Sequence, residues 1–391
     1  MKAAASLVVG ASAGEAGRRA AALARDDLEA RPELAVLFAS GHYSAEAHVL
    51  LDAVSEELGR DEPDQVPLVG CVAGSVIGAG QEVEGVPAVS LWLACGFDPP
   101  GVETFSVEYL GTASGGLFAG HRFEPGGGPY LLFSDPFTFP LEELLEHLNA
   151  NVSGALVAGG VAGGGVAGSR SSELFLDGRV LHEGAVGARL AGVAVDLIVS
   201  QGCRPIGSPY TVTKAEGHML REIAGRPALE RLEQLAAGLA ERERALLEGG
   251  GLHLGVAMDE YRDHQGRGDF LVRTIMAADP HTGSLLLAGE IGVGQTVQFH
   301  VREATPAGQD LRDALEREAD RLAGRGPAGV LLFSCNGRGS NLFPIPDHDA
   351  GMVATVLGPV PTVGFFAAGE LGPVCGKNFL HTLSASLAVF R

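Results

Sequence analysis

Residues 329–343 read GVLLFSCNGRGSNLF: an apolar run ends in Phe-Ser and passes at once into a Cys, an Asn and an Arg set between glycines. A short apolar run bounded by turn residues is typical of a buried strand. Two other stretches open in the same way, AVLFASGHY at 35–43 and YLLFSDPFT at 130–138. The sequence therefore predicts one structural unit used three times.

Each copy continues with the same order of elements. A polar turn follows the Phe-Ser strand, then a helix, then a second apolar strand that runs into a Gly-rich turn, and finally an alternating strand. The three second strands with their turns are VPLVGCVAGSVIG (66–78), ALVAGGVAGGGVAG (155–168) and VPTVGFFAAGELG (360–372). Two parallel-type strands joined by a helix imply a right-handed crossover. In the first copy one helix face is apolar, with Ala47, Leu50, Leu51, Val54 and Leu58.

The remaining segments predict a second, more antiparallel region. A strand at 4–9 and a helix at 14–28 precede the first copy, although a short signal peptide is the alternative interpretation of this N-terminus. The central strands are expected at 197–200, 253–258, 270–277, 284–289 and 296–303, and long helices at 227–248 and 309–322. We expect an α/β protein of two domains, 1–200 and 201–391, with mixed or antiparallel sheets and flanking helices, built from repeated strand–helix–strand units with Gly-rich turns.

Composition excludes several classes of function. The formal charge is −20 and no basic run occurs, so a surface that follows nucleic-acid phosphates is not expected. No stretch of ~18 strongly apolar residues suggests a membrane span. The 5 cysteines show neither zinc-ribbon nor redox-motif spacing, which is typical of reduced thiols in a cytoplasmic protein.

Several motifs in a fixed order resemble one known family. The N-terminal half carries LFASGHY, VPLVGCVAGSVIG and LFSDP followed by LVAGGVAGGG. The C-terminal half carries QGCRPIGSPYTVTKAEGHMLREIAGRPALERL, FLVRTIM, FSCNGRG and GFFAAGELGP followed by HT. Across nearly the whole chain the sequence resembles FIST proteins, named for their occurrence with F-box and intracellular signal-transduction modules, and both the N- and C-terminal FIST domains are represented.

The resemblance implies a sensory protein that binds small molecules, for which amino acids are suggested ligands. It implies no cofactor and no catalytic residue. FIST domains are found beside signalling domains or an F-box, and this sequence shows neither. We therefore expect any output to act through a separate signalling protein. The segment 205–210, PIGSPY, is part of the family signature and is expected to join the two domains.

The loop after residue 334 is the candidate ligand site. Such loops at the carboxyl ends of strands in α/β sheets commonly build sites. Arg338 offers a planar fork for a carboxylate, and Glu370 lies in the corresponding turn of the paired strand. The two charges suit the two ends of a zwitterionic amino acid. The alternative is that Arg338 pairs with a structural carboxylate such as Glu370. The full candidate set is Cys335, Asn336, Arg338, Gly339, Glu370, Asn378, His381 and Thr382.

Three other site hypotheses follow from the residues. Cys335 with His381 or His348, oriented by Glu370 or Asp349, would form a nucleophilic Cys–His–acid set for a hydrolase or transferase. Gly163, Gly165 and Gly168 match G-x-G-x-x-G, but a turn and a strand follow rather than the helix that a dinucleotide site needs. Two acidic clusters lack zinc-ligand spacing, and we expect no metal there: Asp347-His348-Asp349, and Asp259-Glu260 with Asp263-His264. A scaffold without any small ligand is the remaining alternative.

Overall fold

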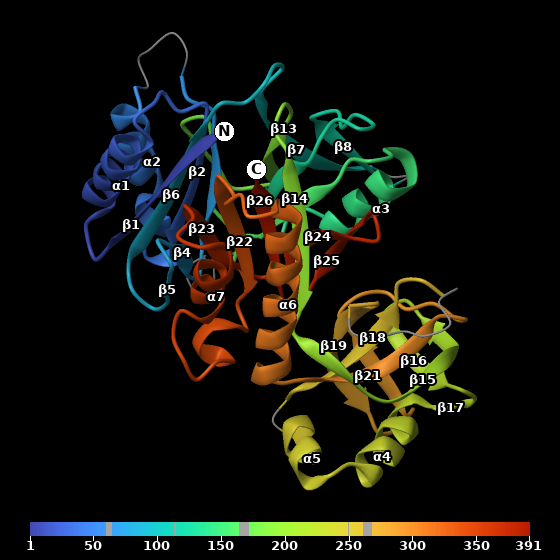
Figure 1. Cartoon of the computed structure of the whole chain (residues 1–391). Helices are drawn as coiled ribbons and strands as arrows, with labels where there is room; N and C mark the ends of the chain where they lie inside the picture. Colours follow the sequence, from blue (N-terminus) through green and yellow to red (C-terminus); the bar gives the residue numbers. More distant parts are fainter. Residues whose placement is uncertain (60–64, 113–114, 164–171, 249, 261–267) are drawn as a thin grey trace. The chain divides into compact units, whose positions relative to one another are not determined.

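The computed structural model describes residues 1–59, 65–112, 115–163, 172–248, 250–260 and 268–391 (Figure 1). The chain forms two compact units. The larger consists of Met1–Val199, Arg312–Leu380 and Ser384–Arg391, and the smaller of Ser200–Leu311 and His381–Leu383. The chain thus enters the smaller unit near the predicted boundary at 200, and then returns to the larger unit at Arg312 and again at Ser384.

The larger unit contains three copies of one strand–helix–strand–hairpin–strand motif, which we call copies 1, 2 and 3. Copy 1 comprises β2 (Leu34–Ser40), α2 (Ala47–Glu57), β3 (Leu68–Ala73), β4 (Val76–Gly78), β5 (Gln81–Val83) and β6 (Ala88–Cys95). Copy 2 comprises β9 (Tyr130–Ser134), α3 (Leu141–Asn151), β10 (Val157–Val161), β11 (Leu174–Leu176), β12 (Arg179–Leu181) and β13 (Ala185–Leu190). Copy 3 comprises β22 (Gly329–Cys335), α7 (His348–Leu357), β23 (Thr362–Ala367), β24 (Glu370–Val374), β25 (Lys377–His381) and β26 (Ser384–Phe390). The predicted repeat and the α/β class are confirmed.

Each copy builds the centre of its own sheet. Its first two strands are parallel, and its last strand is antiparallel to the first. Further strands extend the sheets beside β6, β13 and β26 respectively: β1 (Lys2–Val9), β7 (Val102–Thr112) with β8 (Gly115–Gly120), and β14 (Val195–Gln201). Helix α1 (Ala13–Leu28) lies beside α2 against the sheet of copy 1 (Figure 1). Helix α6 (Ala304–Leu322) leads from the smaller unit back into the larger one.

The short hairpin of each copy pairs with the sheet of another copy. Hairpin β4–β5 of copy 1 extends the sheet of copy 3 beside β23. Hairpin β24–β25 of copy 3 extends the sheet of copy 2 beside β10. Hairpin β11–β12 of copy 2 extends the sheet of copy 1 beside β3. This cyclic exchange covers one edge of every sheet and joins the three copies into a closed ring.

Matching turns explain why the three hairpins form. Each has two central residues with positive φ, namely Ala79-Gly80, Asp177-Gly178 and Cys375-Gly376. Positive φ at both positions defines the type I′ turn, whose twist suits a two-residue hairpin loop. Glycine tolerates the second position without strain. The turn geometry is therefore repeated although the residue before each glycine differs.

A phenylalanine from each copy meets the others in the core. Phe38, Phe133 and Phe333 occupy the same place in the Phe-Ser strands, and all three are fully buried. Phe38 and Phe133 pack edge to face with ring centroids 5.2 Å apart, and Phe133 and Phe333 do so at 5.8 Å. Phe365 contacts all three rings. Burying such rings together stabilises the centre of the ring of copies.

The smaller unit is a closed ring of six antiparallel strands. The strands are β15 (Cys203–Glu216), β21 (Thr296–Arg302), β18 (Leu252–Ala257), β19 (Phe270–Asp279), β20 (Ser284–Leu287) and β16 (Met219–Ile223). β16 pairs back with β15, which closes the ring, and β17 (Arg226–Pro227) adds to β16. The predicted helix at 227–248 is wrong as one element: it divides into α4 (Ala228–Gly238) and α5 (Glu241–Glu248). Leu239 between them is extended, and Gly238 has low helix propensity.

Two buried histidines predict an acid-sensitive smaller unit. His253 and His300 are opposite each other on β18 and β21, and burial lowers the pKa of each to about 4. The unfolded chain binds protons to histidine below about pH 6.5. Stability from this pair is therefore fully present above pH 6.5 and is lost as the pH falls toward 4. We expect His253→Leu to flatten the decline of the calorimetric unfolding temperature across this range. An unchanged slope would contradict the assignment.

Candidate functional site

The carboxyl ends of several strands meet around Asn336. Asn336 follows β22, and Gly74, Gly163 and Ala368 follow β3, β10 and β23. A methyl group added at Gly163 would lie 3.1 Å from Asn336 Nδ2 and 3.2 Å from Ala368 Cβ, and one at Gly74 would lie 3.6 Å from Asn336 Oδ1. Gly74, Gly163 and Ala368, one residue from each copy, thus meet at one exposed amide side chain, as strand ends commonly do where α/β proteins bind ligands. We call this place the strand-end junction.

Arg338 leaves this junction and pairs with Asp349. Both side chains are completely buried. Arg338 Nε donates to Asp349 Oδ2 at 2.6 Å, and Nη2 donates to Oδ1 at 2.8 Å. Burial alone favours the neutral carboxyl, but the facing guanidinium holds the pKa of Asp349 well below its usual range. Two guanidinium nitrogens of Arg338 therefore bind a structural carboxylate, and this carboxylate is that of Asp349 rather than that of Glu370.

The Arg338–Asp349 pair sits at the start of α7 and is fixed there by further contacts. Ser334 Oγ donates to Asp349 Oδ2 at 2.7 Å. The backbone N–H groups of Asp349 and Ala350 donate to Glu82 Oε1 at 2.7 and 3.0 Å. Glu82 comes from β5, the exchanged strand of copy 1, and a carboxylate is favoured at a helix N-terminus. Burial and then the charge of Asp349 nevertheless raise the pKa of Glu82 to about 7.

Glu370, the first residue of β24, is close to the Cys335 thiol and is also completely buried. Its Oε2 accepts hydrogen bonds from Ser384 N at 3.0 Å and Ser384 Oγ at 2.8 Å. Burial raises the pKa of Glu370 to about 8, although Ser384, the Cys335 thiol and the Arg338 charge all favour its ionised form. At neutral pH this carboxyl is thus mainly protonated. Strongly shifted carboxyls of this kind cluster at functional sites.

Two buried polar atoms of the Arg338, Asp349 and Glu370 cluster have no ordinary hydrogen-bond partner among the described residues. Within the described part of the chain, neither Glu370 Oε1 nor Arg338 Nη1 has a nitrogen or oxygen hydrogen-bond partner. Burial lowers the pKa of Arg338, but the charge of Asp349 and, to a smaller extent, that of Glu370 raise it, so Arg338 and Glu370 influence each other. An unpaired buried polar atom costs about 1–3 kcal/mol, so native proteins seldom keep one without a reason. Cys335, which is 8% exposed, lies at the edge of the cluster.

The other candidate residues lie elsewhere. Asn378 accepts from Val157 N at 2.9 Å and donates to Ala155 O at 2.8 Å, at the amino end of β10 and so away from Gly163. His381 and Thr382 belong to the smaller unit, where Thr382 Oγ1 donates to Val272 O at 3.1 Å. Gly339, by contrast, follows Arg338 directly. A methyl group at Gly339 would lie 2.6 Å from Glu84 Oε1, and its φ of 54° suits glycine.

Among the described residues, His348 is engaged by Asp349 and Phe343 rather than by Cys335. The His348 ring bonds Asp349 Oδ1 at 2.9 Å and stacks on Phe343, and no described contact joins it to Cys335. Arg338 packs over the same Phe343 ring. In the ranges that the structure covers, no group of three His, Cys, Asp or Glu side chains is placed to hold a metal ion. Gly165, Gly168, Asp263 and His264 lie outside the described residues.

Sequence comparison matches two domains in order. The FIST N domain matches residues 33–226 and the FIST C domain matches residues 228–373. The chain is 44% identical over 378 residues to the uncharacterised protein Mb0898c of Mycobacterium bovis, covering 96% of this chain and 95% of the relative. It is 44% identical over 377 residues to the uncharacterised proteins MT0656 and Rv0628c of Mycobacterium tuberculosis, covering 96% of each chain.

The fold defines an α/β protein built from three exchanged copies of one strand–helix–strand unit. The two domain matches span most of the sequence, and the chain belongs to the FIST family. FIST domains are associated with sensing and signal transduction. None of the described helices is long and apolar enough to cross a membrane.

Proposed function

We propose that this protein is a cytoplasmic sensor that binds a small amino-acid-like metabolite at the strand-end junction and signals through a separate protein. The observation that carries the proposal is the convergence of three Gly-rich turns on Asn336, next to buried Arg338 and Glu370 that each keep one unpaired polar atom. Five free cysteines support a reducing compartment.

The ligand would use only part of the set of groups that the sequence suggested. Asp349 occupies two nitrogens of Arg338, so only Nη1 remains for a ligand carboxylate. Glu370 Oε1 remains for an ammonium group. Asn336 would supply the exposed amide contact, and Cys335 and Gly339 would line the approach. Arg338 is completely buried, so the turns at the junction must move for the ligand to reach it.

The protonation of Glu370 gives a specific test. An ammonium group beside Glu370 would lower its pKa, which is about 8 in the free protein, and the carboxyl would release a proton at pH 7. We expect calorimetry with a panel of amino acids to find at least one ligand. Its apparent binding enthalpy should differ between buffers of different ionisation enthalpy, in proportion to roughly one released proton per ligand.

Three variants complete this experiment. Glu370→Gln should abolish the buffer dependence, because the amide cannot ionise, whereas Glu56→Gln on the exposed surface of α2 should preserve it. Asn336→Ala should weaken binding by about tenfold, the usual worth of one lost hydrogen bond in a partly buried site. If the folded wild-type protein binds no amino acid, this ligand class is wrong. Binding without proton release would exclude Glu370 as the ammonium partner.

A further inference from the structure

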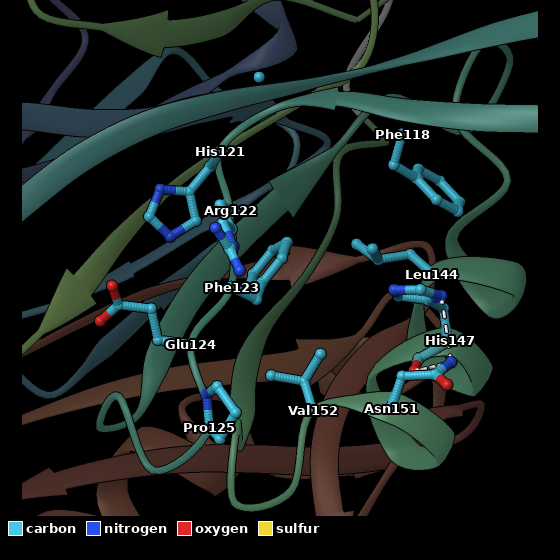
Figure 2. Close-up of a pocket in the computed structure, with 11 residues that line it drawn as sticks. Phe118, His121, Arg122, Phe123, Glu124, Pro125, Leu144, His147, Asn151 and Val152 are labelled. Carbon is cyan, nitrogen blue, oxygen red and sulfur yellow. Dashed lines mark hydrogen bonds between the residues drawn. The ribbon is translucent and has the colours of Figure 1, made fainter.

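A pocket of about 870 Å³ lies beside helix α3 of copy 2 (Figure 2). It is formed by the segment that leads from β8 toward β9 and by helix α3. Its apolar wall consists of Phe118, Phe123, Pro125, Leu144 and Val152, and its polar groups are His121, Arg122, Glu124, His147 and Asn151. A pocket of this size, in which polar groups converge beside apolar side chains, is a candidate small-molecule site.

His121 is a buried ring that keeps one nitrogen for a ligand. Its side chain is 7% exposed and stacks on Phe105 with centroids 4.0 Å apart. Nδ1 lies 3.8 Å from the carboxylate of Glu103, and burial lowers the pKa of the imidazole, which is therefore neutral. The nearby negative charge favours the proton on Nδ1, which leaves Nε2 as an acceptor. Among the described residues Nε2 has no hydrogen-bond partner.

Arg122 supplies an unpaired positive charge beside this ring. Glu124 is already engaged by Arg189, whose Nη1 lies 2.9 Å from its Oε2. His147 is held by Asn151, whose amide bonds both the ring and the carbonyl of His147 (Figure 2). No such partner is found for the exposed Arg122 among the residues that the structure covers. A guanidinium in this position suits a carboxylate.

We propose that this pocket binds an aromatic carboxylic acid that also carries a hydroxyl or N–H donor. The carboxylate pairs with Arg122, the ring packs between Phe118 and Phe123, and the donor bonds Nε2 of His121. The residues that line the pocket precede β9 or belong to α3 and its end, whereas the strand-end junction lies after β3, β10, β22 and β23. The proposal is therefore independent of amino-acid binding at the junction.

Calorimetry with 4-hydroxybenzoate tests the pocket, with benzoate and 4-hydroxybenzyl alcohol as probes that lack one group each. We expect 4-hydroxybenzoate to bind at one site and benzoate to bind about tenfold more weakly, because Nε2 then stays unpaired. Arg122→Gln should weaken 4-hydroxybenzoate by about tenfold or more, since it removes a charge-assisted contact. Arg317→Gln makes the same charge change on an exposed position of α6 and should have no effect.

A third variant separates recognition from stability. His121→Phe keeps an aromatic ring against Phe105 and removes Nε2, so the preference for 4-hydroxybenzoate over benzoate should disappear while benzoate still binds. Asn336→Ala should leave all these affinities unchanged, because it alters only the junction. The proposal is overturned if wild-type protein binds no 4-hydroxybenzoate at millimolar concentration, or if Arg122→Gln binds it as well as wild type.

Discussion

Asp349→Asn should lower the free energy of unfolding of the larger unit by about 3–5 kcal/mol, the usual cost of removing one partner of a buried ion pair. The substitution keeps the size of the side chain, removes its charge and turns one accepting oxygen into an NH2 donor that faces other donors. Arg338 would then hold a buried charge without its bidentate counter-ion, and the nearest other carboxyl is Glu370, whose pKa burial raises to about 8. Trp92, the single tryptophan, is completely buried in the larger unit, so its fluorescence during denaturant unfolding reports this loss.

A double substitution distinguishes charge from packing. Arg338→Met together with Asp349→Asn removes both charges, and buried ion pairs can often be replaced by uncharged groups at little cost. We expect this double variant to regain a large part of the stability that Asp349→Asn loses. A single variant that unfolds within about 1 kcal/mol of wild type would show that the pair is more hydrated than its burial indicates.

Alanine at Gly70, Gly159 or Gly364 should destabilise the larger unit by about 3 kcal/mol or more, because the core cannot accept the extra methyl group. These glycines occupy the same place in the three copies, opposite Leu37, Leu132 and Leu332 in the parallel strand pairs. An added Cβ would lie only 1.8, 2.0 and 1.7 Å from the carbonyl oxygens of those leucines. Neither backbone can move away without breaking the sheet.

A glycine in open space provides the control. A methyl group at Gly326 would meet no atom within 4 Å. Gly326→Ala should therefore leave the free energy of unfolding, followed by Trp92 fluorescence, within about 0.5 kcal/mol of wild type. If one of the three core substitutions is tolerated as well as this control, that copy does not need the close strand approach. Similar losses of unfolding free energy at all three positions would show that every copy requires the same close approach of its two parallel strands.

Local patterns predicted the repeat but not how the copies join. The Phe-Ser strands, their helices and their second strands follow from apolar runs, periodicity and glycines, which depend on nearby residues. The pairing of β4 with β23 joins Val76 to Phe365, and no short-range pattern encodes such a partner. The division of α4 from α5 was missed because the charged surface of that segment fits a continuous helix equally well.

The site shows the same limit. The sequence identified Arg338 and Glu370 as charges at corresponding strand ends, and the structure places both in one buried cluster. The sequence alone does not show which carboxylate pairs with Arg338. It indicates Asp349 only as part of an acidic cluster or as an orienting acid. Glu82 was missed entirely, since it reaches α7 only through the exchanged hairpin of copy 1. Distant residues acquire roles once topology brings them together.

The exchange of hairpins has a consequence for synthesis on the ribosome. Hairpin β4–β5 is translated long before β23, the strand that it will cover, and β10 keeps an open edge until β24 has been made. Open edges invite pairing with other chains, and contacts between distant segments form slowly. The nascent protein therefore carries one unpaired hairpin and one sheet with an open edge through much of its translation, and protection during that interval becomes a requirement of the architecture itself.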